Sequence, residues 1–134
     1  MVAVASGSKL AIGDRIMGIT DFLHGWGGYA EFAYVVERSA VTVPAALSEE
    51  QAGGFPIAYC TAYSELVQRS KLQPGETLVV LGAHGSSGLP AIQLGKALGV
   101  RVITVAGSAE MLAFASGAGA DAGGQLPRRG SHRA

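Results

Sequence analysis

A glycine-spaced turn that directly follows an apolar run constrains this chain more than any other feature. Residues 78–88 read LVVLGAHGSSG, and the apolar run at 78–81 predicts a strand. A helix-compatible stretch follows the turn, and a second apolar run at 102–105 predicts another strand. Strand, tight turn, helix and strand, in this order, form the βαβ unit that binds a dinucleotide pyrophosphate over a helix N-terminus.

The glycines of the turn have mechanical roles in this interpretation. Gly85 lets the backbone approach phosphate oxygens, and Gly88 lets the helix pack closely on the strand. Unpaired N–H groups at the start of the helix would then meet the negative charge. The first glycine of the usual G-x-G-x-x-G spacing is Ala83 here, so a plain strand–helix connection is the alternative interpretation.

Length and composition bound the class of protein. The 134 residues match about one domain, on a usual size of ~100–200 residues. A hydrophobic content of 49% with 15% charged residues is typical of a soluble globular protein. Ten basic and ten acidic residues leave no net charge, and no apolar run approaches the ~20 residues of a membrane span. We therefore expect no nucleic-acid or membrane partner, and a cytoplasmic location by default, with a mitochondrial one left open.

The residues before the glycine turn predict a β-rich segment and then helices. Strands are expected at 14–18, 29–37 and 41–43. Ser48 and Gln51 then fit a capping box, with Ser48 as the N-cap of a helix.

Two prolines are expected to interrupt the regular structure after the capping box. Pro56 should break the helix, after which apolar positions at i, i+4 spacing predict a second helical stretch to about Arg69. Pro74 and Gly75 make the turn into the strand at 78–81.

Beyond residue 105 the regular pattern soon ends. Ser108 is expected to cap a last helix, whose apolar stripe is interpreted as core: Met111, Phe114, Ala115 and Ala118. The pattern stops after Asp121. Residues 123–134 are expected to be a disordered tail, with a basic binding tail as the alternative.

The chain resembles the medium-chain dehydrogenase/reductase superfamily, and within it the zinc-independent quinone oxidoreductases of the zeta-crystallin-like branch. The resemblance runs collinearly from about residue 10 to 121. It is carried by the segments GDRIMG, GGYAEFAYV, LSEEQAGGFPIAYCTAYSEL, LQPGETLVVLGAHGSSGLPAIQLGKALG, VITVAGSAE and GAGAD. It implies an α/β protein in which a GroES-like catalytic domain is followed by a Rossmann domain.

The resemblance also implies the domain organisation of this chain. Residues 1–43 would be part of the GroES-like β-rich catalytic domain and 44–74 a helical connector. Residues 75–122 would be a truncated Rossmann unit with a parallel βαβα order, ending after two of the usual six strands. We therefore expect an incomplete chain with a foreign tail at 123–134, which alone shows weak or no NADPH binding and no turnover.

The same resemblance implies cofactor-binding residues. Thr61 matches the family threonine that contacts the nicotinamide ring, although a helical threonine can instead bond to its own backbone. Ser86 and Ser87 replace the Gly-Val of relatives, and their N–H groups would still donate to the pyrophosphate. At the end of the second strand, Gly107 and Ser108 stand where a carboxylate would select NADH. The absence of that acid favours NADPH, but Met111 replaces the lysine of strongly NADPH-selective relatives, so NADH stays possible.

A metal site is not expected. The resemblance implies a zinc-ligand cysteine near Cys60 in alcohol-dehydrogenase relatives, but that cysteine matches Ile57 of this chain and not Cys60. A zinc site needs three or four ligands at defined spacing, which one cysteine and the scattered His24, His84 and His132 do not supply.

Three functional hypotheses remain open. The first is an NADPH-dependent oxidoreductase that transfers a hydride to a quinone or an activated alkene (an enone). The second is an enoyl-thioester reductase of the same superfamily. The third is a non-catalytic truncated product that survives as an interaction partner. The resemblance implies a homo-oligomeric full-length parent and leaves the catalytic residues unidentified.

Overall fold

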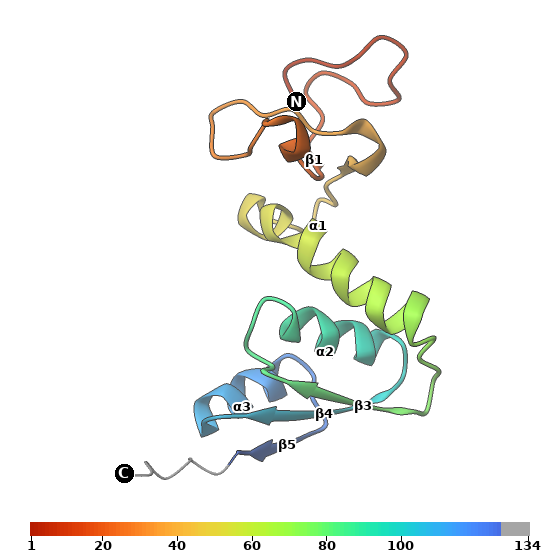
Figure 1. Cartoon of the computed structure of the whole chain (residues 1–134). Helices are drawn as coiled ribbons and strands as arrows, with labels where there is room; N and C mark the ends of the chain where they lie inside the picture. The colour runs from red at the N-terminus through yellow and green to blue at the C-terminus, as the bar shows by residue number, and fades with distance from the viewer. Residues whose placement is uncertain (127–134) are drawn as a thin grey trace. The chain divides into compact units, whose positions relative to one another are not determined.

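The computed structural model describes residues 1–126. They divide between Ile57 and Ala58 into an N-terminal unit and a C-terminal unit. The elements follow in the order β1 (Ile16–Met17), η1 (Phe22–His24), η2 (Glu37–Ser39), β2 (Val41–Thr42), α1 (Glu49–Tyr63), η3 (Ser64–Arg69), β3 (Thr77–Leu81), α2 (Gly88–Ala97), β4 (Arg101–Ala106), α3 (Ala109–Gly117) and β5 (Ala122–Gln125). Figure 1 shows the mixture of helices with two separate small sheets.

The N-terminal unit contains much less regular structure than the sequence predicts. Its sheet consists of β1 and β2, which pair antiparallel, so the strands expected at 14–18 and 41–43 are present but shorter. The prediction of a strand at 29–37 is wrong. Within that segment an isolated antiparallel bridge joins Val35 to Thr20, and η2 begins at Glu37.

Exposure explains the missing strand. Tyr29 is fully exposed, and Phe32 and Tyr34 are about two thirds exposed. Aromatic and β-branched residues favour a strand when the side chains of a neighbouring strand pack against them. Here Tyr29 and Phe32 stay exposed, and Tyr34 contacts Trp26 edge to face, with ring centroids 4.8 Å apart. The hydrogen bonds from Asp21 N–H to the Tyr34 carbonyl and from Val36 N–H to the Ile19 carbonyl hold the segment locally.

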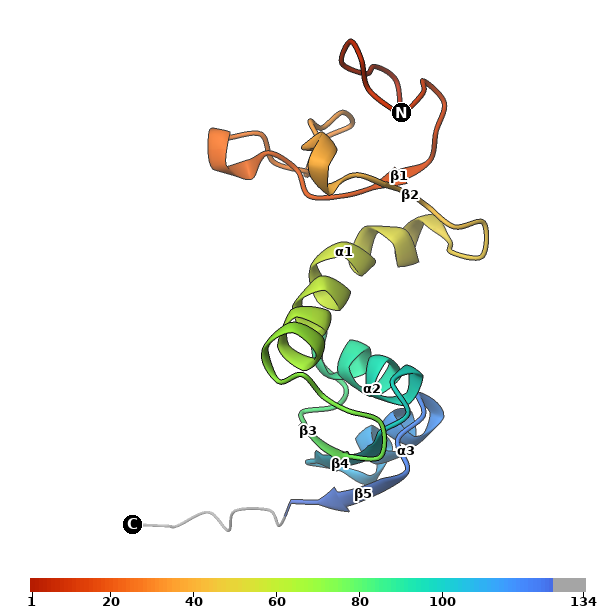
Figure 2. The same cartoon turned by 90° about the vertical axis from the view of Figure 1, so that its right-hand side faces the viewer.

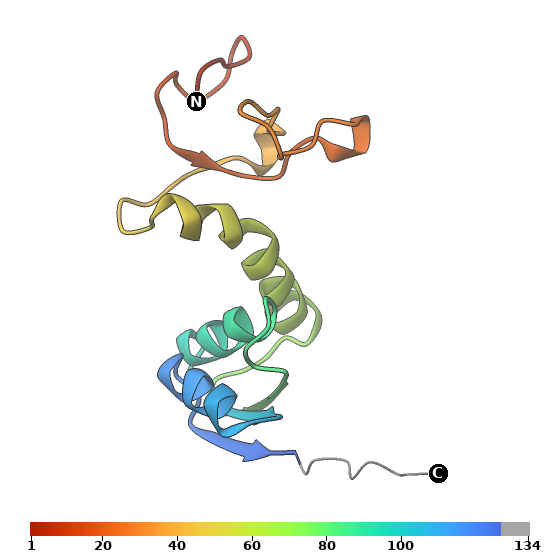
Figure 3. The ribbon, with the colours of Figure 1, turned by 90° about the vertical axis from the view of Figure 1, so that its left-hand side faces the viewer.

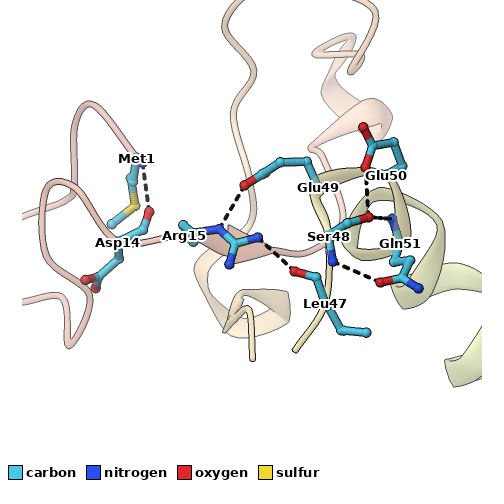
Figure 4. Close-up of polar contacts among 8 residues, drawn as sticks. All are labelled: Met1, Asp14, Arg15, Leu47, Ser48, Glu49, Glu50 and Gln51. Carbon is cyan, nitrogen blue, oxygen red and sulfur yellow. Dashed lines mark hydrogen bonds and ion pairs between the residues drawn. The ribbon is translucent and has the colours of Figure 1, made fainter. Parts of the chain in front are cut away.

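The start of α1 is fixed by the predicted capping box, which Figure 4 shows in detail. Gln51 N–H donates to Ser48 Oγ at 3.2 Å, and Ser48 N–H donates to Gln51 Oε1 at 2.9 Å. Arg15 adds a contact from the neighbouring strand segment, since its Nε donates to Glu49 Oε1 at 2.8 Å and its Nη2 to the Leu47 carbonyl at 3.0 Å. The capping prediction is confirmed.

The interruption expected at Pro56 is wrong, because Pro56 lies inside a continuous helix from Glu49 to Tyr63. Proline removes one backbone donor from the ladder, and the bonds on either side of it keep the helix intact. The helix changes instead at η3, a π-helical turn in which Ser70 N–H donates to the Glu65 carbonyl five residues earlier. Its end at Arg69 agrees with the prediction.

The C-terminal unit is built on a parallel three-stranded sheet in the order β3-β4-β5. Leu78 pairs with Val102 and Leu81 with Val105, which confirms the two predicted strands and their parallel direction. The third strand, β5, pairs parallel to β4 and lies at the edge of the sheet (Figure 2). The expectation that regular structure ends after Asp121 is therefore wrong for residues 122–125, and the rest of that expected tail, 127–134, lies outside the described residues.

Helices α2 and α3 pack on one face of the sheet (Figure 3). A Cβ atom added to Gly95 of α2 would lie 3.0 Å from both Leu78 Cδ2 and Val102 Cγ2, and one added to Gly123 of β5 would lie 2.8 Å from Leu112 Cδ2 of α3. The core between helices and sheet includes Val80, Ala83, Ile92, Val100, Val102 and Ala115.

The opposite face of the sheet is open in the described unit. Side chains alternate along a strand, so Val79 and Leu81 point away from the helices. Val79 is 55% and Leu81 73% exposed. On the helix side, Phe114 is 48% exposed, so its predicted place in the core is wrong, whereas Ala115 beside it is fully buried.

Candidate functional site

The turn between β3 and α2 is shaped by the glycine at its start. Gly82 has a φ of 68°, in the left-handed region that favours glycine. Its N–H donates to the Val105 carbonyl of β4 at 3.2 Å, and its carbonyl accepts from Gly85 N–H at 3.0 Å. The turn is thus anchored to the carboxyl ends of both strands.

Gly88 is the residue at which a side chain is least tolerated. A Cβ atom there would lie 2.6 Å from the Gly82 carbonyl oxygen and 2.7 Å from Ala83 Cα. These are backbone atoms, which cannot move aside as the end of a flexible side chain can. Helix α2 therefore begins in direct contact with the turn that precedes it.

The serines of the turn have unengaged polar groups. Within residues 1–126, the N–H groups of Ser86 and Ser87 donate no hydrogen bond, whereas Gly85, Gly88 and Leu89 donate to carbonyls of the turn. Ser87 is the N-cap of α2, but its side chain makes no capping bond. Pro90 is the third residue of α2, where the missing N–H costs little.

A second turn, Gly107–Ser108, lies at the same end of the sheet as the first. Because β3 and β4 run parallel, residues 82–88 and the Gly107–Ser108 turn both leave the carboxyl ends of their strands. Ser108 Oγ accepts from Met111 N–H at 3.3 Å, which confirms Ser108 as the N-cap of α3. A Cβ atom added to Gly107 would meet nothing within 4 Å, so this turn is open to solvent.

Gln125 joins this group of residues, although the sequence interpretation assigned it to a tail. It is the last residue of β5 and pairs with Ala106, the last residue of β4. Its Nε2 donates to the Gly107 carbonyl at 3.3 Å. No local sequence signal marks Gln125, because the strand that carries it consists of Ala-Gly-Gly-Gln and has no apolar pattern.

Thr61 lies outside these two turns, on an exposed part of α1. Two residues before it, the Tyr59 hydroxyl hydrogen-bonds Gln93 Oε1, so this end of α1 is joined to α2. The sheet thus brings together the predicted residues Gly85, Ser86, Ser87, Gly88, Gly107 and Ser108, while Thr61 comes from a different element.

At the other end of the sheet, where the strands begin, lies an ion pair. Lys96 Nζ donates to Asp121 Oδ1 at 2.6 Å, and Val102 N–H donates to Asp121 Oδ2 at 2.7 Å. The Lys96 hydrogen bond and then the Val102 hydrogen bond lower the pKa of the Asp121 carboxyl. This pair ties α2, β4 and the start of β5 together.

The N-terminal unit contains a separate cleft of about 850 Å³, with mostly apolar lining. Its polar lining includes Ser8 and Glu37, which are joined by a hydrogen bond of 2.8 Å. In neither unit, within residues 1–126, do three His, Cys, Asp or Glu side chains come together in a way that would hold a metal ion. No helix among these residues is both long and apolar enough to cross a membrane.

Two curated proteins show the range of relatives. The quinone oxidoreductase of Homo sapiens is 36% identical over 84 residues, which cover 63% of this chain and 26% of that protein. The reducing polyketide synthase rdc5 of Metacordyceps chlamydosporia is 37% identical over 101 residues, which cover 75% of this chain and 4% of that protein. The chain thus spans about a quarter or less of the length of these relatives. No protein-family model matches it.

Two solved structures are similar in fold. A probable oxidoreductase of Mycobacterium abscessus is 33% identical with a TM-score of 0.84, and the match covers 96% of this chain and 40% of that one. The quinone oxidoreductase of Thermus thermophilus, solved also in complex with NADPH, is 37% identical with a TM-score of 0.66, over 72% of this chain and 32% of that one. These similarities agree with the collinear motifs and support the resemblance to the medium-chain dehydrogenase/reductase superfamily, with quinone oxidoreductases among the relatives.

Proposed function

We propose that this chain supplies the NADPH-binding part of a reductase. The observation that carries the proposal is the turn at 82–88, which joins a parallel strand to a helix. Backbone atoms fill the space that a side chain at Gly88 would need. The N–H groups of Ser86 and Ser87 lack acceptors among the described residues. Such N–H groups at a helix start bind anions, and a strand–turn–helix of this kind is the usual binding site of a dinucleotide pyrophosphate. In this proposal the C-terminal unit is of the Rossmann type.

The residues of the two turns fit the cofactor. Within residues 85–88, the N–H groups of Ser86 and Ser87 and the free Ser87 hydroxyl would donate to the pyrophosphate. Gly107 and Ser108 would hold the 2′-phosphate of the adenosine ribose, and Thr61 would contact the nicotinamide. When bound, NADPH supplies the hydride, and the protein orients it.

The second turn favours NADPH over NADH to a limited extent. A carboxylate at the end of β4 would accept hydrogen bonds from ribose hydroxyls and repel a 2′-phosphate. Here Gly107 and Ser108 occupy that place, and the turn is open. Met111 contributes no positive charge, so we expect a modest preference with NADH still able to bind.

We propose a quinone or an activated alkene as the hydride acceptor and the N-terminal unit as part of a GroES-like catalytic domain. The proposal is supported by similarity to quinone oxidoreductases and to a solved oxidoreductase over 96% of the chain. An enoyl-thioester reductase is the second candidate, favoured by the similarity to a reducing polyketide synthase.

The two acceptors can be separated by spectrophotometry at the NADPH absorbance. The longest form of the protein that its transcript encodes is mixed with NADPH and either 1,4-benzoquinone or crotonyl-CoA. Faster NADPH oxidation with the quinone supports the first proposal, and faster oxidation with the thioester supports the second. A form of reductase length that folds but oxidises NADPH with neither acceptor contradicts both and leaves the non-catalytic hypothesis.

A further inference from the structure

Gln125 is placed where it can influence the nucleotide. Its strand ends at the same sheet edge as the turns at 82–88 and 107–108. Its carboxamide donates to the Gly107 carbonyl at 3.3 Å, and Leu126 N–H donates to the Ala106 carbonyl at 3.0 Å beside it. The end of β5 therefore braces the backbone of the Gly107 turn.

We infer that Gln125 is a positioning residue that fixes the Gly107 turn and sets the preference for a 2′-phosphorylated adenosine. The inference rests on the proposed nucleotide site. Gln125 acts in two ways: its N–H holds the turn in place, and its neutral side chain puts no negative charge next to the 2′-phosphate.

The charge of the side chain at position 125 matters because this side chain lies next to the Gly107–Ser108 turn. Gln125 contacts Gly107 directly, so a 2′-phosphate bound at the Gly107–Ser108 turn would lie well within the screening length of ~8–10 Å at moderate salt. A carboxylate in place of the carboxamide would repel the phosphate and would lose the donor to the Gly107 carbonyl. A nucleotide without the 2′-phosphate would feel little of this repulsion.

The test uses the 134-residue chain and two probes, adenosine 2′,5′-bisphosphate and 5′-AMP. Amide chemical shifts in ¹H–¹⁵N NMR titrations give both dissociation constants even when binding is weak. For Gln125→Glu we expect the ratio of the two affinities to fall by about tenfold, because repulsion weakens the bisphosphate beyond the small loss that the missing hydrogen bond causes for both probes. Gln125→Met, which removes the hydrogen bond without adding charge, should weaken both probes by a similar small factor.

Gln68→Glu is the matched control, because Gln68 is an exposed residue of η3 outside both turns. It makes the same change of charge and should leave the ratio unchanged. An unchanged ratio in Gln125→Glu while both probes still shift residues 85–88 overturns this inference and leaves the nucleotide site intact. Failure of both probes to shift those residues in the unmodified chain overturns the proposed site itself, and the inference with it.

Discussion

Gly88 shows how one residue fixes the geometry of the candidate site. The space that its Cβ would need is filled by the backbone of Gly82 and Ala83, at 2.6 and 2.7 Å. The close contact lets α2 start immediately against the turn, so that its first N–H groups face the carboxyl edge of the sheet. The residue is therefore required by the packing of the turn before any ligand is considered.

Gly88→Ala should destabilise the C-terminal unit by about 1–3 kcal/mol, because the added methyl group forces the turn and helix apart. It should also weaken nucleotide binding. Urea denaturation measures the first effect. Gly117→Ala, at the open C-terminal end of α3, is the control and should be neutral or stabilising by up to ~1 kcal/mol. A Gly88→Ala variant as stable as the original chain would show that the turn is not packed as described.

Met111→Lys should tighten the binding of NADPH by about tenfold and leave NADH nearly unchanged. Met111 lies in the first turn of α3, next to the Ser108 cap, and a lysine ammonium there can donate to a 2′-phosphate. A charge-assisted hydrogen bond is worth ~1.5–3 kcal/mol. Fluorescence titration with each cofactor gives the two affinities, and Met111→Gln serves as an uncharged control. Equal tightening of both cofactors would contradict the assignment of this turn to the 2′-phosphate.

At the scale of elements, the Asp121 carboxylate joins parts of the C-terminal unit at the end of the sheet where the strands begin, away from the candidate site. It accepts hydrogen bonds from Lys96 of α2 and from the Val102 N–H of β4, and it immediately precedes β5. Gly119, with a φ of 111°, makes the turn that brings Asp121 to this place, and a Cβ atom added to it would lie 3.1 Å from Lys96 Cγ. One side chain thus joins a helix and two strands.

This contact should make the stability of the unit depend on acid pH. The pKa of Asp121 is lower in the folded state than its ordinary value of ~3.9, so the stabilisation is fully present above that value. It is lost as the pH falls through the folded-state pKa, because the unfolded chain then binds the proton more readily. Urea denaturation between about pH 6 and pH 3, on the order of half-unit steps, should show this loss.

Asp121→Asn should be less stable than the original chain at neutral pH and should lose less on acidification. Lys96→Gln keeps the bond from Val102 N–H and should show an intermediate loss. Parallel stability profiles for the original chain and Asp121→Asn over this range would mean that the carboxylate does not stabilise the unit.

Some elements could be predicted from the sequence because their signals are local. The capping box of Ser48 and Gln51 and the Ser108 cap depend on residues three positions apart, and both form as expected. The two apolar runs of β3 and β4 were likewise sufficient, since continuous apolar segments are typical of parallel strands. The turn between them carried its own signature in its glycines.

Other elements depend on partners that a sequence pattern does not reveal. β5 contains two glycines and no large apolar side chain, and it forms because the edge of β4 offers backbone hydrogen bonds. Gly123 is favoured there by the close approach of Leu112, which no neighbouring residue indicates. The reverse holds at 29–37, where a strong strand pattern leaves its aromatic side chains largely exposed and forms no strand. Gln125 was missed as a site residue for the same reason as its strand.

At the scale of the whole molecule, the most consequential feature is the open face of the parallel sheet. Val79 and Leu81 are exposed on it, and the described unit pairs three strands. Contiguous exposed apolar side chains on a sheet favour association with other chains. The described residues also place their candidate cofactor groups on the two turns at one edge of the sheet and on Thr61.

We therefore expect the purified 134-residue chain to associate, to bind NADPH weakly and to show no NADPH oxidation with 1,4-benzoquinone or 9,10-phenanthrenequinone. Size-exclusion chromatography with light scattering measures the association, and absorbance measures turnover. Turnover by a monomeric, well-folded sample would contradict this expectation and would mean that the described residues suffice for hydride transfer.

The central claim, that the turns at 82–88 and 107–108 bind NADPH, is tested most directly by an NMR titration of the ¹⁵N-labelled chain with this cofactor. We predict saturable shifts of the amides of Gly85, Ser86, Ser87, Gly88 and Gly107, weakened in Gly88→Ala. Shifts confined to residues 1–57, or no shift at these amides at millimolar NADPH, would contradict it.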